Sequence, residues 1–236
     1  MKYAILTVDD RLLCSFDTIR PILKGYGFRC TFFVTGATNL WTQWPDMNWD
    51  HVAQLDEEGF EIGNHTMNHR CPSWAIMEKD LLDLEEKLEE LGVRKPVSFA
   101  YPGYVVNPNG QEVLKKHNYA FGRYGYANIM WHYNLNTRLH PVHPNFDIPH
   151  HLHITGALNH QYTFEHFKAD MEHLPDESAA IFNTHHVIAD DEIARLTKIC
   201  RYIASQDNMT MITLRDVLKY SSLCPKQYTN NQHNQE

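Results

Sequence analysis

Short apolar segments rich in β-branched and aromatic residues recur along this chain at intervals of roughly 20 to 40 residues, and helical patterns fill the stretches between them. The clearest helix is 76–91, where apolar residues repeat at helical spacing from Met77 onward and Gly92 follows as the C-terminal cap. The predicted strands are 3–8, 30–34, 60–62, 97–100, 119–123, 180–184 and 209–212. This alternation predicts βαβ units with a parallel sheet, and about seven units in one domain favour a barrel whose site lies at the carboxyl ends of its strands.

A doubly wound open sheet is the competing architecture. The first strand is followed by neither a GxGxxG fingerprint nor a P-loop, which argues against a dinucleotide site. We expect a single domain over residues 1–220 and a polar, frayed tail over 221–236. Residues 127–157, rich in proline, asparagine and histidine, predict a long excursion over the surface with room for one short strand.

The composition excludes some classes of partner. The 236 residues hold 29 acidic and 21 basic side chains, a net charge of −8, which argues against nucleic acid because phosphate binding needs clustered Lys and Arg. No apolar run approaches the ~20 residues of a membrane span, and the N-terminus reaches Asp9 and Asp10 before a secretory h-region could form. We therefore expect a cytoplasmic protein without a membrane partner, or an exported one whose leader has been removed. The 5 cysteines are scattered without a CxxC pair and are expected to be reduced thiols, whereas 16 histidines direct attention to metal binding.

Polar residues capable of chemistry directly follow three of the predicted strands. Asp9 and Asp10 end the first strand, and both can face one pocket only if the chain turns there, since neighbours on a strand point to opposite faces. His65 and His69 follow the third strand with the i, i+4 spacing that can chelate one metal on one side of a helical turn. His185 follows a later strand, at the tip where barrels place catalytic groups. Taken singly, the aspartate pair is better explained as a solvated turn and the histidine pair as two surface histidines, and His185 could belong to a polar strand end.

Together the three features supply two histidines and a carboxylate for a metal site, a second carboxylate as base and a histidine as acid. Thr66 stands where the zincin pattern requires glutamate, so the base must come from elsewhere. A zinc-like metal with one open position lowers the pKa of its bound water to about 7, which suits hydrolysis of an amide or an ester. Zn²⁺ is the expected ion, and Co²⁺, Mn²⁺ or Ni²⁺ would suit the same ligands.

One segment of the chain reads Gly59-Phe60-Glu61-Ile62-Gly63-Asn64-His65-Thr66-Met67-Asn68-His69. It closely resembles the second motif of the NodB-like polysaccharide deacetylases, a family of metal-dependent carbohydrate esterases. Residues 7–10 resemble the first motif of that family, 22–36 its second strand, 99–104 a variant of its third motif and 211–214 its closing strand. The likeness covers about residues 3–220. It implies a single-domain α/β fold, a distorted (β/α)7 TIM-like barrel, that removes acetyl groups from an N-acetylated amino sugar or an acetylated polysaccharide.

The resemblance assigns roles residue by residue. It implies that Asp9 is the general base and that Asp10, His65 and His69 hold the metal. An aspartate with a pKa near 4 is a weak base, and water acidified by a metal needs only a weak one.

The acid and the oxyanion site are also implied by the resemblance, with His185 protonating the leaving group and the backbone N–H of Gly103 helping to stabilise the oxyanion. Ala100 departs from the family pattern, because many members carry an arginine there that pairs with the base. Arg123, after the fifth strand, is either the substitute, as in relatives with an Ala-Tyr-Pro-Gly third motif, or an ordinary surface arginine. The fourth motif is not recognisable around Trp131, which leaves a carboxylate partner for His185 unassigned.

Two other functions stay open on the sequence. The same barrel could hydrolyse a non-sugar amide such as a cyclic imide or a ureide, or it could bind carbohydrate without catalysis, which the alanine at position 100 favours. Further histidines are expected to line the cleft or the surface rather than to form a second metal site: His140, His143, His150, His151, His153 and His160. Four tryptophans could stack on sugar rings or fill gaps over the barrel mouth: Trp41, Trp44, Trp49 and Trp74.

Overall fold

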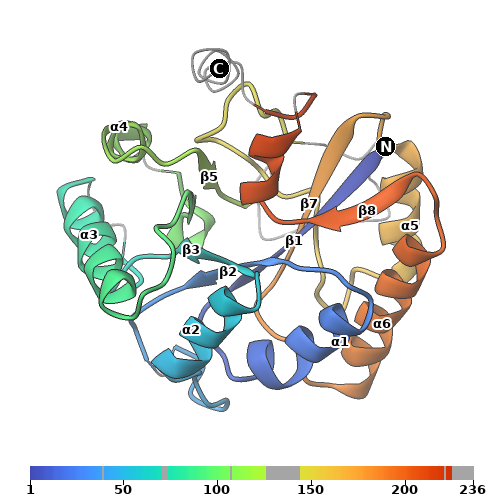
Figure 1. Ribbon diagram of the computed structural model, residues 1–236, viewed down its shortest axis with the longest axis horizontal. Coiled ribbons are helices and arrows are strands. Elements are labelled where there is room, and N and C mark those ends of the chain that lie inside the picture. Colours follow the sequence, from blue (N-terminus) through green and yellow to red (C-terminus); the bar gives the residue numbers. More distant parts are fainter. Residues whose placement is uncertain (39, 71–73, 107, 126–143, 221, 225–236) are drawn as a thin grey trace.

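A computed structural model describes residues 1–38, 40–70, 74–106, 108–125, 144–220 and 222–224 (Figure 1). Its strands are β1 (Lys2–Asp9), β2 (Thr31–Val34), β3 (Glu61–Asn64), β4 (Ser98–Ala100), β5 (Phe121–Arg123), β6 (Gly156–Ala157), β7 (Ser178–Thr184) and β8 (Met209–Ile212). Its α-helices are α1 (Arg20–Gly25), α2 (Trp49–Glu57), α3 (Trp74–Glu90), α4 (Pro108–Lys116), α5 (Phe164–His173) and α6 (Asp190–Ala204). A π-helical turn at Ser15–Ile19 precedes α1, and 3-10 turns occupy Pro102–Tyr104 and Arg215–Lys219. Every strand predicted from the sequence is present, with ends that differ by up to two residues.

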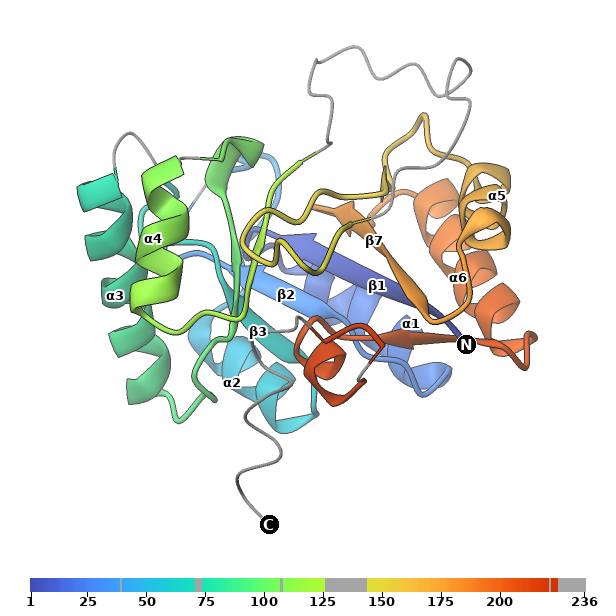
Figure 2. The same ribbon diagram turned by 90° about the horizontal axis from the view of Figure 1, so that it is seen from above.

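The strands form one parallel sheet in the order β5-β4-β3-β2-β1-β7-β6, with β8 paired to the start of β1. The order steps in one direction from β1 to β5, without the reversal that defines a doubly wound sheet. The sheet is curled and its helices lie around its outer side, which is the arrangement of a distorted α/β barrel (Figures 1 and 2). Because β1 is central and covered on both faces, all of its residues after Lys2 are buried.

The described part of the segment that follows the fifth strand, 144–157, is exposed at Asn145, Asp147 and Ile148, as expected. From Pro149 to Ala157 it does not run over the surface, so the expectation is wrong there. It passes between β5 and β7 and supplies backbone partners to both (Figure 2). Gly122 N donates to Pro149 O at 2.8 Å, Leu152 N donates to Gly122 O at 2.8 Å, and Thr155 N donates to Ile181 O at 2.6 Å. The physical reason is that both strands carry backbone groups that would otherwise be unpaired in the interior of the molecule. Residues 126–143 and 225–236, which include most of the expected tail, lie outside the described residues.

A buried carboxylate lies at the end of the barrel that the amino ends of the strands form. Glu61, at the start of β3, is 1% exposed and accepts hydrogen bonds through both oxygens. Its Oε1 accepts from Ser98 Oγ at 2.6 Å, and its Oε2 accepts from Thr31 Oγ1 and from Arg215 N, each at 2.7 Å. These contacts join β2, β3 and β4 to the turn after β8, so the amino ends of the strands are sealed by satisfied polar groups.

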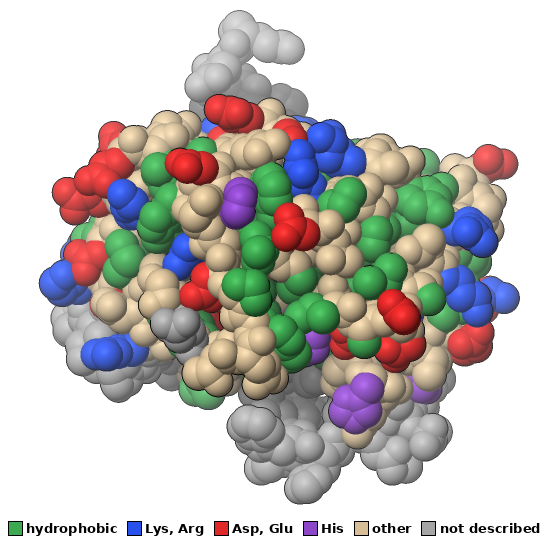
Figure 3. Space-filling view, turned by 90° about the horizontal axis from the view of Figure 1, so that it is seen from below, with side chains coloured by type: hydrophobic (Ala, Val, Ile, Leu, Met, Phe, Trp, Pro, Cys, Tyr) green, Lys and Arg blue, Asp and Glu red, His purple; other side chains and the backbone are tan. Residues whose placement is uncertain are grey.

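The outer face that carries α1 and α2 mixes acidic, basic and apolar side chains without a large patch of either charge (Figure 3). Within the described ranges, no helix is long and apolar enough to cross a membrane.

Candidate active site

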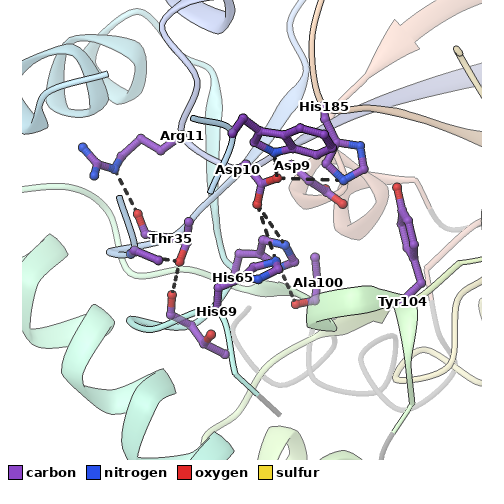
Figure 4. Close-up of polar contacts among 12 residues, drawn as sticks. Asp9, Asp10, Arg11, Thr35, His65, His69, Ala100, Tyr104 and His185 are labelled. Carbon is purple, nitrogen blue, oxygen red and sulfur yellow. Dashed lines mark hydrogen bonds and ion pairs between the residues drawn. The ribbon is translucent and has the colours of Figure 1, made fainter. Parts of the chain in front are cut away.

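A cavity of about 180 Å³ opens at the carboxyl ends of the strands. Its walls come from the ends of β1, β3 and β7, from the turn after β4 and from the loop after β2 (Figure 4). The lining residues are Asp9, Asp10, Leu40, Trp41, His65, His69, Tyr101, Gly103, Tyr104 and His185. The structure thus brings together every site residue predicted from the sequence except Arg123, which lies behind the cavity and contacts Asp9.

The chain turns at Asp10, as the paired aspartates require if both are to face one pocket. β1 ends at Asp9, and Asp10 has a φ of 62°, in the left-handed region. Thr66, His69 and Tyr104 share that conformation, with φ of 67°, 52° and 60°. Non-glycine residues rarely adopt such angles and are strained by about 1 kcal/mol or more, so their concentration around this cavity is typical of a functional site.

Asp10, His65 and His69 form a compact group of potential metal ligands, whose ligand atoms lie within 4.8 Å of one another. Asp10 Oδ1 lies 3.7 Å from His65 Nε2 and 3.5 Å from His69 Nε2. This oxygen is buried, and no donor among the described residues hydrogen-bonds to it. His65 directly follows β3 and His69 lies in the bend after it, and neither is on a helical turn, so the spacing predicted the pair correctly but the local structure wrongly.

The surroundings of His65 favour a neutral imidazole. Its Nδ1 is 2.8 Å from Ala100 O, so Nδ1 carries the proton and Nε2 is left as the ligand atom. Burial lowers the pKa of His65 below its ordinary value, against the opposing charges of the two aspartates. A carboxylate oxygen that accepts no hydrogen bond from the described residues and two imidazole nitrogens form a donor set that suits a divalent metal ion, so these residues fit such an ion.

Arg123 pairs with Asp9 in the interior of the protein. Its Nη2 donates to Asp9 Oδ1 at 2.5 Å, and the guanidinium packs over the Phe33 ring at 5.1 Å. Arg123 is 0% exposed, so its interpretation as a surface residue is wrong. Burial raises the pKa of Asp9, but the charge of Arg123 and its hydrogen bond outweigh that effect and hold the pKa below its ordinary value.

Asn183 and Tyr104 also support Asp9, and the sequence reasoning missed both. In the amide orientation that satisfies its neighbours, Asn183 Nδ2 donates to Asp9 Oδ1 at 3.1 Å and to Thr7 O at 3.0 Å, while its Oδ1 accepts from the Tyr104 hydroxyl at 2.6 Å. The available signal was strand periodicity, because Asn183 lies two residues before His185 and so points to the same side of β7.

His185 and Gly103 complete the wall of the cavity. His185 Nε2 lies 3.9 Å from Asp10 Oδ2, and its ring meets the edge or face of Trp41 and Tyr104 at centroid distances of 5.5 and 5.7 Å. Gly103 has a φ of 65°, which glycine adopts without strain.

The remaining histidines form no second metal group within the described residues. His150 is buried and its Nε2 contacts Tyr119 O at 2.6 Å, whereas the rings of His151 and His153 pack against Tyr124. His140, His143 and Trp131 lie outside the described residues. Of the tryptophans, Trp44 packs on the ring of His186 at 4.4 Å and Trp49 lies under the guanidinium of Arg11 at 4.5 Å.

Comparison with known proteins identifies the family and supports the fold. Residues 1–122 match the family model described as polysaccharide deacetylase, which is more than half of the chain. A peptidoglycan-N-acetylglucosamine deacetylase of Bacillus cereus is 34% identical over 141 residues, a match that covers 58% of this chain and 60% of that protein. The chain therefore belongs to the polysaccharide deacetylase family.

Solved structures share the fold. Peptidoglycan deacetylase PdaC from Bacillus subtilis is similar over 100% of this chain and 98% of its own, with a TM-score of 0.59 and 15% identity. A family 4 acetyl xylan esterase from Clostridium thermocellum in complex with a cobalt ion is similar over 92% of this chain and 90% of its own, with a TM-score of 0.58 and 17% identity. These likenesses support the distorted barrel.

Proposed function

We propose that this protein is a metal-dependent deacetylase that hydrolyses acetyl groups from an N-acetylated amino sugar or an acetylated polysaccharide. The observation that supports the proposal is Asp10 Oδ1, which lies beside two imidazoles and accepts no hydrogen bond from the described residues. A second carboxylate, that of Asp9, lines the same cavity and accepts a hydrogen bond from Arg123. The Bacillus cereus relative, named for its action on peptidoglycan N-acetylglucosamine, makes that amino sugar the first substrate to try.

Asp10, His65 and His69 would hold the metal, which when bound polarises the acetyl carbonyl and acidifies water beside it. Zn²⁺ is the proposed ion, and Co²⁺, Mn²⁺ and Ni²⁺ suit the same ligands. The Clostridium thermocellum esterase carries cobalt, which supports testing that ion second.

Asp9 is the proposed general base, because its carboxylate lines the cavity while Arg123 and Asn183 orient it. In this role it takes the proton of the attacking water. Its lowered pKa keeps it ionised near neutral pH, where a base must be unprotonated.

His185 is the proposed acid that protonates the leaving amine or alkoxide, and it lies across the cavity from the His65–His69 pair. The backbone N–H of Gly103 would donate to the developing oxyanion. Arg123 acts through Asp9: it fixes one carboxylate oxygen and balances the buried charge.

The test is acetate release from N-acetylglucosamine oligomers, peptidoglycan and O-acetylated xylan, with zinc or cobalt supplied. Asp9→Asn should reduce turnover by about 10²–10⁴-fold while metal still binds. Asp83→Asn on the outside of α3 is the matched control and should leave turnover unchanged. Retained turnover in Asp9→Asn would contradict its role as base. Hydrolysis of a cyclic imide or ureide without any acetate release would replace the proposed substrate class.

A further inference from the structure

Trp41, in the loop after β2, hydrogen-bonds to Asp10. Its indole Nε1 donates to Asp10 Oδ2 at 2.6 Å. The other oxygen of the same carboxylate, Oδ1, is the one that faces the Nε2 atoms of His65 and His69. The two oxygens of Asp10 therefore have separate environments, one occupied by a donor from the protein and one left for a ligand.

The loop that carries Trp41 is fastened to the residues that directly follow Asp10. Met47 N donates to Arg11 O at 2.7 Å, and Leu13 N donates to Pro45 O at 2.8 Å. Arg11 is 4% exposed, and its Nε donates to Thr35 O at 2.9 Å (Figure 4). Because the loop is tied down in this way, the indole N–H is held in place beside the carboxylate.

We propose that Trp41 is a positioning residue for the metal site, which orients Asp10 through its hydrogen bond and thereby raises the affinity for the ion. The inference rests on the metal site proposed above. A carboxylate ligand without an outer partner turns about its terminal torsion, and hydrogen bonds to such ligands are worth about 10–100-fold in metal affinity.

The oxygen that accepts from Trp41 also lies 3.9 Å from His185 Nε2, and the rings of Trp41 and His185 pack at a centroid distance of 5.5 Å. Trp41 therefore contacts both the proposed metal ligand and the proposed acid.

The experiment compares Trp41→Phe with Trp44→Phe. Phenylalanine keeps an aromatic wall at either position and removes only the N–H and part of the ring, and Trp44 lies beside Trp41 at a centroid distance of 5.9 Å. The readout is the zinc dissociation constant, measured by competition with a chelator, together with the melting temperature of the metal-free protein. We expect Trp41→Phe to weaken zinc binding by about 10–100-fold with little change in melting temperature, and Trp44→Phe to leave zinc binding within about 3-fold of wild type.

Unchanged zinc affinity in Trp41→Phe, or an equal loss in Trp44→Phe, would overturn the inference and leave the proposed function standing. A wild-type protein that binds no zinc or cobalt would overturn both. If Trp41→Phe fails to fold, the indole N–H signals of ¹⁵N-labelled wild-type protein decide: the Trp41 signal, among the 5 tryptophans, should shift on adding zinc. A Trp41 signal that does not move would overturn the inference.

Discussion

Asp10 and Glu61 are both buried carboxylates, at 4% and 1% exposure, and they lie at opposite ends of the same barrel. Glu61 has donors at both oxygens, whereas Asp10 has a donor at Oδ2 and none among the described residues at Oδ1. Since an unmet buried carboxylate oxygen costs stability, the fold keeps Asp10 in this state only if something else compensates. Burial alone therefore does not distinguish a structural carboxylate from a functional one. The distinguishing feature is a carboxylate oxygen that accepts no hydrogen bond from the protein.

Removing the charge of Asp10 is expected to have the largest effect. Asp10→Asn retains an acceptor for Trp41 and tolerates the left-handed φ, but it should weaken zinc binding by about 10²-fold or more because the charged ligand is lost. The melting temperature of the metal-free variant should equal or exceed that of wild type. Titration calorimetry and thermal melts measure the two quantities, and zinc affinity within 3-fold of wild type would remove Asp10 from the metal site.

Truncating Glu61 should give the opposite pattern. Glu61→Ala leaves the hydroxyls of Thr31 and Ser98 and the amide of Arg215 without their buried acceptor, so the free energy of unfolding should fall by about 3 kcal/mol or more. Zinc affinity of the folded fraction should not change. Denaturant unfolding measures the loss, with Glu61→Gln as the milder control, and a stability loss below about 0.5 kcal/mol would break the contrast with Asp10.

Added zinc should stabilise variants at the two ends of the barrel to different extents. Zinc at 100 times its dissociation constant should raise the free energy of unfolding of wild type by about 2.7 kcal/mol, because the ion binds only the folded state. The same rise is expected in Glu61→Gln and little or none in Asp10→Asn. Thermal melts with and without zinc report the difference, and equal rises in all three proteins would place the ion away from Asp10.

The smallest effect on stability is expected at Glu58, the residue after α2. Its carboxylate differs from those of Asp10 and Glu61 because it is paired with basic side chains near the surface. Hydrogen bonds from Arg20, and then from Lys24, hold the pKa of Glu58 well below its ordinary value. A lowered folded-state pKa contributes stability above about pH 4.3 that is lost as the pH falls through the folded-state value. Glu58→Gln should therefore cost about 1 kcal/mol or less at pH 7 and less still below pH 3, measured by denaturant melts at both pH values. A larger cost at the acidic pH would reverse the sign of the argument.

The group of potential metal ligands was predictable because each of its members lies within a few residues after a predicted strand. Parallel strands bring their carboxyl ends to one edge, so Asp10, His65 and His69 needed only correct strand positions to be placed together. The hydrogen-bond partner of Asp9 could not be predicted from strand ends. Ala100 vacates the expected position, and Arg123 reaches the carboxylate from β5, a contact between residues 114 positions apart.

Residues 149–157 were misread because their polar composition resembles that of a surface loop, whereas they supply backbone hydrogen bonds to β5 and β7. Glu61 and Asn183 were not singled out, since neither residue type within a strand indicates whether its polar atoms are satisfied. Trp41 was predicted only to cover the barrel mouth or to stack on sugar rings, although its N–H donates to Asp10, a proposed metal ligand.

The sequence by itself determined the order of strands and helices, the parallel sheet and the set of residues at its carboxyl edge, because periodicity and strand ends are local properties. Only the tertiary structure decided which donor meets which acceptor: Arg123 with Asp9, Trp41 with Asp10, and three donors with Glu61. The physical reason is that a hydrogen bond requires two atoms to lie about 3 Å apart, and the number of residues between them in the sequence does not determine that distance.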